Sequence, residues 1–176
     1  MPAGSLKLHG RVRAVLPENI DTDIIYPGRY LNITDREQTT AHLFELAYPD
    51  LRGALQPGDF ILAGRNFGCG SSREQAAAAL KFAGVGAVIA GSFGRIFFRN
   101  AINLGLPAVV AADAAAGCST GDELEIDLVA GEIRNLTRGV IFQAAPLDAR
   151  AAELLAAGGL IPYLKSKYVG GGGRHE

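Results

Sequence analysis

The feature that most constrains the fold is a regular alternation of short apolar runs with segments of helical composition. Apolar runs occupy residues 60–63, 86–90 and 106–111, and the helical segments 71–83 and 93–103 separate them. Apolar runs of this length, separated by helices, are typical of buried strands that pair in parallel through right-handed crossovers. We therefore predict an α/β fold with parallel strands at its centre.

Segments outside this alternation predict strands of a different kind. Residues 5–16 and 123–129 alternate polar and apolar side chains, as half-buried strands do. Ala130-Gly131 predicts a hairpin turn into a strand at 132–137. The other expected elements are a loop at 20–30, a partly helical segment at 34–47, a strand at 140–142, a helix at 147–157 and a short element at 160–168.

Length and composition indicate one globular domain. The chain has 176 residues, of which 48% are hydrophobic and 20% charged, a balance typical of folded proteins. We expect residues 1–168 to form that domain and the glycine-rich residues 169–176 to be a disordered tail.

Charge and hydropathy exclude several classes of partner. The net charge of −1 gives no electrostatic basis for binding nucleic acid or a membrane surface. Residues 1–10 lack the apolar core of a signal peptide. No apolar run approaches the ~20 residues of a membrane span. We therefore expect a cytoplasmic protein.

The cysteine count argues against a metal centre in this chain. Cys69 and Cys118 are its two cysteines, and they do not form a CxxC pair. Structural zinc sites usually take four Cys or His ligands, and cubane iron–sulfur clusters typically take four thiolates. We expect no metal bound by this chain alone.

The glycine-rich stretch 64–75 is the strongest candidate for a functional site. Its glycines allow a sharp turn between the strand and the helix. Ser71 stands three residues before Glu74, a capping-box spacing that predicts Ser71 as the helix cap. Ser72 and Arg73 are then not needed for capping. An arginine at a helix N-terminus is unfavourable unless an anion is bound there, so the stretch predicts either an anion site or simply a capped glycine turn.

A second segment contributes carboxylates. Asp21 and Asp23 flank Thr22, and isoleucines lie on both sides of the three residues. The pattern favours an Asx-type turn anchored in the core. The alternative is a carboxylate directed into the same site as the glycine stretch.

Three motifs together resemble a known family. The sequences at 66–74 (NFGCGSSRE), 21–27 (DTDIIYP) and 91–97 (GSFGRIF) are similar to those of the small subunits of aconitase-superfamily hydro-lyases, namely isopropylmalate isomerase (3-isopropylmalate dehydratase) and its homoaconitase relatives. The resemblance covers about residues 5–165. It implies the swivelling domain of aconitase, a β/β/α layered, barrel-like α/β fold. It also implies a separate large subunit that carries a [4Fe–4S] cluster, in a heterodimer or heterotetramer.

The resemblance also implies roles for individual residues. Ser71 corresponds to the catalytic base and Asp23 to an active-site aspartate that supports proton transfer. Ser72 and Arg73 correspond to residues that hold a substrate carboxylate. The substrate-selecting loop corresponds to Tyr30, Leu31, Asn32, Ile33 and Thr34.

The substrate implied is a small hydroxy-di- or tricarboxylate. Asn32 stands where homoaconitase-like members carry an arginine, which favours the apolar group of isopropylmalate. The expected reaction is the interconversion of 2- and 3-isopropylmalate by dehydration and rehydration, a step of leucine biosynthesis. The alternatives are homoaconitate, citramalate or 2,3-dimethylmalate as substrate, because Gln75 replaces the histidine of many bacterial members and this compact branch includes such enzymes. A stand-alone dicarboxylate-binding module is the non-enzymatic alternative.

Overall fold

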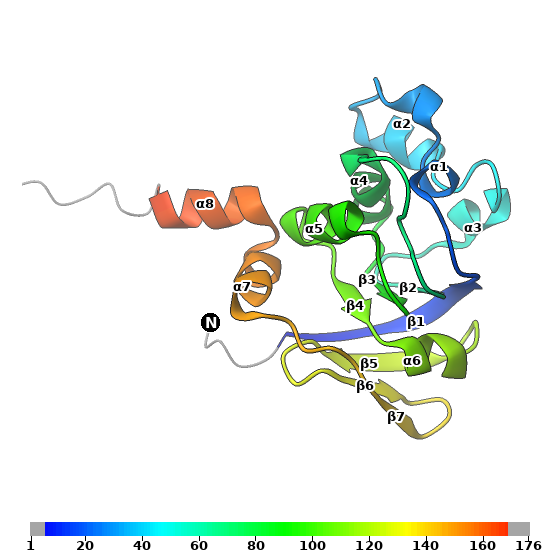
Figure 1. Cartoon of the computed structure of the whole chain (residues 1–176), viewed down its shortest axis with the longest axis vertical. Coiled ribbons are helices and arrows are strands. Elements are labelled where there is room, and N and C mark those ends of the chain that lie inside the picture. Colours follow the sequence, from blue (N-terminus) through cyan, green and yellow to red (C-terminus); the bar gives the residue numbers. More distant parts are fainter. Residues whose placement is uncertain (1–5, 169–176) are drawn as a thin grey trace, which may run out of the picture.

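A single curled sheet of seven strands organises the molecule, for which a computed structural model describes residues 6–168 (Figure 1). Its strands lie in the order β4-β3-β2-β1-β5-β6-β7. Their bounds are β1 Lys7–Leu16, β2 Phe60–Ala63, β3 Ala87–Ala90, β4 Ala108–Val110, β5 Glu123–Asp127, β6 Glu132–Asn135 and β7 Val140–Gln143.

The long strand β1 joins two kinds of sheet. Its second half pairs in parallel with β2, with Val12 opposite Phe60. Its first half pairs antiparallel with β5, with Lys7 opposite Asp127. Strands β2, β3 and β4 continue the parallel part, and β5, β6 and β7 form an antiparallel meander.

The parallel strands are buried on both faces, which explains why they read as continuous apolar runs. In β2, Ile61 packs in the core beneath the helices, whereas Phe60 and Leu62 face the meander. In β3, Val88 and Ile89 are divided between the same two cores. Because neighbouring side chains of a strand point to opposite faces, the curled sheet separates two cores, as the predicted barrel-like layered α/β fold requires.

The helices lie mainly on the side of the sheet opposite the meander (Figure 1). Helices α4 and α5 follow β2 and β3 as the crossover connections. The helical elements are α1 Thr22–Ile25, the 3₁₀ turn η1 Gly28–Tyr30, α2 Arg36–Ala41, α3 Pro49–Ala54, α4 Glu74–Phe82, α5 Arg95–Asn103, α6 Ala112–Gly117, α7 Ala149–Ala157 and α8 Leu160–Tyr168.

The structure confirms the expected strands and the two crossover helices, and it corrects several local predictions. The expected loop at 20–30 contains the helical turn α1 and the turn η1. Helices α3 and α6 were not predicted, because each has only 6 residues and lacks a long apolar period. The predicted tail at 169–176 lies outside the described residues.

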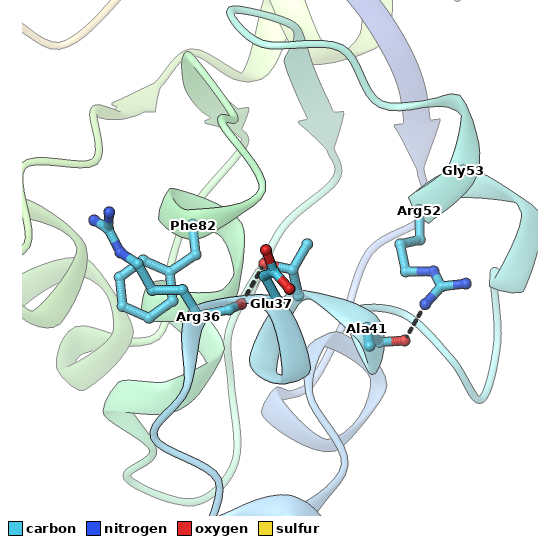
Figure 2. A pocket seen from close by; sticks show the side chains of 7 residues that line it. Arg36, Glu37, Ala41, Arg52, Gly53 and Phe82 are labelled. Atoms are coloured by element: carbon cyan, nitrogen blue, oxygen red, sulfur yellow. Dashed lines mark hydrogen bonds between the residues drawn. The ribbon is translucent and has the colours of Figure 1, made fainter.

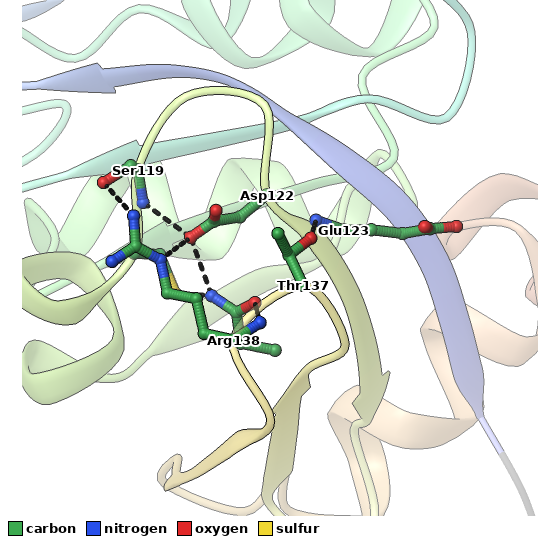
Figure 3. Close-up of polar contacts among 7 residues, drawn as sticks. Ser119, Asp122, Glu123, Thr137 and Arg138 are labelled. Carbon is green, nitrogen blue, oxygen red and sulfur yellow. Dashed lines mark hydrogen bonds and ion pairs between the residues drawn. The ribbon is translucent and has the colours of Figure 1, made fainter.

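A buried polar cluster fixes the turn that leads into β5 (Figure 3). Asp122 accepts hydrogen bonds from the Asn135 side chain at 2.8 Å, from Arg138 Nε at 2.7 Å and from the backbone N–H of Ser119 at 2.9 Å. Burial alone raises the pKa of Asp122, but these donors outweigh it and hold the pKa below its ordinary value. The cluster therefore ties the turn between α6 and β5 to the end of β6 and the turn that follows it.

Within residues 6–168, the helices are all too short or too polar to cross a membrane.

Candidate functional site

The glycine stretch turns sharply because two of its glycines adopt left-handed backbone angles. Gly68 has φ +73° and Gly70 has φ +97°. A Cβ atom at Gly68 would lie 2.2 Å from the Phe97 ring, so only glycine fits there. The backbone N–H of Gly68 donates to the Ile20 carbonyl at 2.7 Å. The turn is thereby fastened to the segment that begins α1.

Ser71 does not cap helix α4, which corrects the capping-box prediction. The helix begins at Glu74, its N-cap position is Arg73, and no side chain caps it. The Thr22 hydroxyl donates to the Ser71 carbonyl at 3.1 Å and the backbone N–H of Thr22 to the Cys69 carbonyl at 2.9 Å. Since these bonds hold Ser71 outside the helix, its hydroxyl is exposed instead of being used for capping.

Arg73 and Asp23, both predicted as site residues, form an ion pair between Nη1 and Oδ1. The backbone N–H of Gly28 donates to the same carboxylate oxygen at 3.0 Å. A Cβ atom at Gly28 would lie 2.8 Å from the guanidinium, so a larger residue would displace it. The Arg73 guanidinium, followed by the Gly28 N–H, holds the pKa of Asp23 below its ordinary value although partial burial opposes the shift. Asp23 is therefore kept ionised.

The two aspartates of the motif make different contacts. Asp21 is the N-cap of α1, and its Oδ1 accepts the backbone N–H of Ile24 at 2.8 Å, as in the Asx-type turn. Asp23, two residues on, is directed to Arg73. The anchoring isoleucines are buried or half-buried as expected.

The predicted substrate-selecting loop lies against the start of α4. The Leu31 carbonyl is 3.5 Å from Gln75 Nε2, a long hydrogen bond. Asn32 and Thr34 are exposed, whereas Leu31 and Ile33 are half-buried. Thus Gln75, the residue that departs from the common family pattern, links the loop to the helix of the glycine stretch.

The Tyr30 side chain contacts Glu45 and His42, which were not predicted as site residues. Its hydroxyl donates to Glu45 Oε1 at 3.0 Å, and its ring stacks on that of His42 with 3.5 Å between centroids. The spacing of His42 and Glu45, three residues apart, is the one sequence signal for this contact.

Sizeable cavities lie away from these residues. One of about 510 Å³ is lined by Arg36, which stacks over Phe82, and by Arg52, which donates to the Ala41 carbonyl (Figure 2). The hydroxyl-bearing loop of Ser71 and Ser72 is instead exposed on the surface.

The residues of the chain that could bind a metal are dispersed over the part that the structure describes. Within residues 6–168, the His, Cys, Asp and Glu side chains form no group of three or more that could hold a metal. Cys69 is half-buried in the glycine stretch, and Cys118 is buried after α6, beside Asn135.

Comparison with known proteins supports the likeness seen in the motifs. Residues 3–113 match the family described as the aconitase C-terminal domain. The 3-isopropylmalate dehydratase small subunit of Moorella thermoacetica is 55% identical over 149 residues, which are 85% of this chain and 90% of that protein. The isopropylmalate/citramalate isomerase small subunit of Methanocaldococcus jannaschii is 50% identical, with 85% of this chain and 89% of that one covered.

Two further comparisons bear on fold and substrate. The methanogen homoaconitase small subunit of Methanothermobacter thermautotrophicus is 50% identical, with 85% of this chain and 86% of that one covered. The crystal structure of 3-isopropylmalate dehydratase from Methanocaldococcus jannaschii superposes with a TM-score of 0.86 at 41% identity, covering 93% of this chain and 96% of the other. The chain therefore belongs to the aconitase C-terminal domain family, among the small subunits of 3-isopropylmalate dehydratases and their homoaconitase and citramalate-isomerase relatives.

Proposed function

We propose that this chain is the small subunit of a hydro-lyase that interconverts 2- and 3-isopropylmalate by dehydration and rehydration in leucine biosynthesis. One observation carries the proposal. An exposed Ser71 hydroxyl, not used for capping, stands just before an uncapped helix N-terminus and close in sequence to an arginine whose guanidinium is fixed by Asp23.

Ser71 is the proposed base of the reaction. Its Oγ would accept the proton that leaves the carbon next to a substrate carboxylate. An alkoxide at this position would be favoured by the uncapped N-terminus of α4 and by the positive charge of Arg73, two residues further along the chain. Elimination would also expel the hydroxyl of the adjacent carbon, for which the cluster of the large subunit would supply the Lewis acid. The isomer forms when Ser71 Oγ returns the proton to the carbon that lost the hydroxyl and water supplies a hydroxyl to the carbon that lost the proton.

Arg73 and Ser72 are the proposed ligands of a substrate carboxylate. Arg73 donates to Asp23 through Nη1, and a guanidinium has five N–H donors in all. Asp23 would thus orient the guanidinium and take part in proton transfer as an ionised carboxylate.

The substrate assignment rests on the loop at 30–34. Asn32 is neutral and exposed, and the half-buried Leu31 and Ile33 offer apolar surface beside it. An isopropyl group fits such a surface better than the additional carboxylate of homoaconitate does. Citramalate, 2,3-dimethylmalate and homoaconitate remain the alternatives to be compared.

The chain is proposed to work in the cytoplasm with a large subunit that carries the [4Fe–4S] cluster, in a heterodimer or heterotetramer. The name small subunit implies a larger partner in the relatives. Support for this comes from the exposed position of the Ser71 loop, which leaves one side of the proposed site open.

The test is an activity panel on the complex reconstituted with its large subunit. Wild type should turn over 3-isopropylmalate faster than homoaconitate or citraconate. Ser71→Ala should lower kcat by about 10²- to 10⁴-fold, the usual contribution of a general base, whereas Ser166→Ala on α8 should not. Full activity of Ser71→Ala would exclude this base. Tight dicarboxylate binding by the isolated chain, without turnover in the complex, would favour the binding module.

A further inference from the structure

Glu45 lies at the centre of a cluster that holds Tyr30, the first residue of the proposed substrate-selecting loop. Its carboxylate accepts hydrogen bonds from three side chains. These are the Tyr30 hydroxyl at 3.0 Å, His42 Nδ1 at 2.5 Å and a guanidinium nitrogen of Arg29. Glu45 follows α2 in a segment that otherwise packs into the core through Leu43 and Phe44, which are fully buried. The carboxylate therefore stands on a firmly anchored part of the chain.

The Tyr30 ring is held on its faces as well as at its hydroxyl. The His42 ring stacks on it at 3.5 Å between centroids and an interplanar angle of 13°. The Arg29 guanidinium carbon lies 4.8 Å from the ring centroid, a cation–π distance. The side chain that carries the ring is thus fixed by the same residues that bond to Glu45.

The backbone of the loop is fixed through Tyr30 too. The Tyr30 carbonyl accepts the hydroxyl of the buried Tyr26 at 3.0 Å and the backbone N–H of Ile33 at 3.0 Å. The Leu31 N–H donates to the Gly28 carbonyl at 3.4 Å. Gly28 in turn contacts the Asp23–Arg73 pair. One continuous set of contacts therefore runs from Glu45 through the loop to the proposed catalytic residues.

The three hydrogen-bond donors around Glu45 favour its ionised form. His42, then Tyr30 and Arg29 as donors, lower the pKa of Glu45 against the opposing effect of burial. Glu45 therefore stays ionised at neutral pH and accepts all three bonds at once. An ionised acceptor makes stronger hydrogen bonds than a neutral one, so the position of Tyr30 depends on this carboxylate.

We infer that Glu45 is a positioning residue that fixes the loop at 30–34 in its binding conformation before substrate arrives, and so determines substrate affinity and selectivity. The inference depends on the proposed function only in that the loop binds a substrate. The order of the loop is a property of this chain, and it can be measured without any reaction.

The first test measures loop order by amide hydrogen exchange in the full chain. Glu45→Gln should speed exchange at the Leu31 and Ile33 amides by at least tenfold relative to wild type, and Glu45→Ala by more. Glu37→Gln is the matched control, because Glu37 is an exposed glutamate on α2 that forms no ion pair among the described residues. Unchanged exchange at these two amides in Glu45→Gln would overturn the inference, whatever the activity of the complex.

The second test separates positioning from a merely structural effect. In the complex reconstituted with the large subunit, Glu45→Gln should raise KM for 3-isopropylmalate about tenfold, equivalent to about 1.4 kcal/mol, with kcat within about threefold of wild type. Tyr30→Phe, which removes only the hydroxyl, should shift KM in the same direction. A fall in kcat at unchanged KM would contradict the inference. If wild type turns over none of the panel substrates, the proposed function fails, and the exchange measurement still decides the role of Glu45.

Discussion

Arg73 donates a charge-assisted hydrogen bond to Asp23, a residue fifty positions earlier in the chain. The Arg73 side chain is largely buried, with 17% of its surface exposed, whereas that of Asp23 is 55% exposed. An arginine held in this way keeps its fork geometry without a bound ligand. The pair therefore prepares the end of the glycine stretch for an anion, instead of waiting for the anion to order it.

The pair makes stability depend on pH in the acidic range. The pKa of Asp23 is lowered in the folded protein from its ordinary value of 3.8. The stability that the pair contributes is therefore fully present above that value and is lost as pH falls through the lower folded-state pKa. Urea unfolding of wild type and Asp23→Asn should show a difference at pH 6 that shrinks towards pH 2. Asp50→Asn, at an exposed aspartate of α3, should show no such convergence. A gap between wild type and Asp23→Asn that is constant with pH would contradict the prediction.

The close approach of Gly68 to Phe97 predicts a sharp difference between two glycine substitutions. Gly58 has φ +89° with no atom within 4 Å of an added Cβ, whereas the Cβ at Gly68 would clash with the ring. Gly58→Ala should cost about 1 kcal/mol of backbone strain. Gly68→Ala should cost about 3 kcal/mol, because overpacking adds to that strain. Chemical denaturation of both variants measures the difference, and equal losses would show that the ring moves aside freely.

The two cysteines should differ in reactivity. Burial raises the pKa of the Cys118 thiol, although the Asn135 side chain, a donor to Sγ at 3.4 Å, opposes the shift. The thiolate is the reactive form, and Cys118 is only 5% exposed. Iodoacetamide at pH 8 should therefore label Cys69 first in the native chain, with both labelled equally in denaturant. Peptide mass spectrometry reports the order, and faster labelling of Cys118 in the native state would be inconsistent with the structure.

The exposed position of Asn32 allows a direct test of selectivity. Asn32→Arg in the reconstituted complex should shift preference towards homoaconitate by about tenfold or more, because an exposed guanidinium can bind the additional carboxylate. The ratio of kcat/KM for homoaconitate and 3-isopropylmalate measures the shift. Thr34→Arg, also at an exposed loop position, is the matched control for added positive charge. An equal shift in both variants would indicate a general charge effect and not recognition by residue 32.

The sequence predicted most of the sheet, because period and burial are properties of short segments. Strands β2 and β3 are buried on both faces and read as uninterrupted apolar runs. Strand β5 is half-buried and alternates. The hairpin turn before β6 was likewise predictable from Ala130-Gly131.

What the sequence could not show depends on contacts between distant segments. The spacing of Ser71 and Glu74 is a valid capping box, yet Thr22 holds the Ser71 carbonyl and delays the helix to Glu74. The motifs predicted a contact between Asp23 and the glycine stretch only as one alternative. The residues around Gly28 gave no indication that its backbone N–H would bind Asp23. Glu45 was missed for the same reason, because two of its donors, Arg29 and Tyr30, come from η1 and reach it only in the folded chain.

Strand β1 has a consequence for how the chain acquires its structure. One half of β1 pairs with the parallel strands and the other half pairs with the meander. Without β1, β2 and β5 would each be an unpaired edge strand. The partners of β1 lie far along the chain, and pairings of such high contact order form slowly. A nascent chain that ends before β5 exposes the first half of β1 as an open edge, which is prone to associate with other chains. We therefore expect the sheet to close only after β5 has been synthesised, and β1 to be prone to aggregation until then.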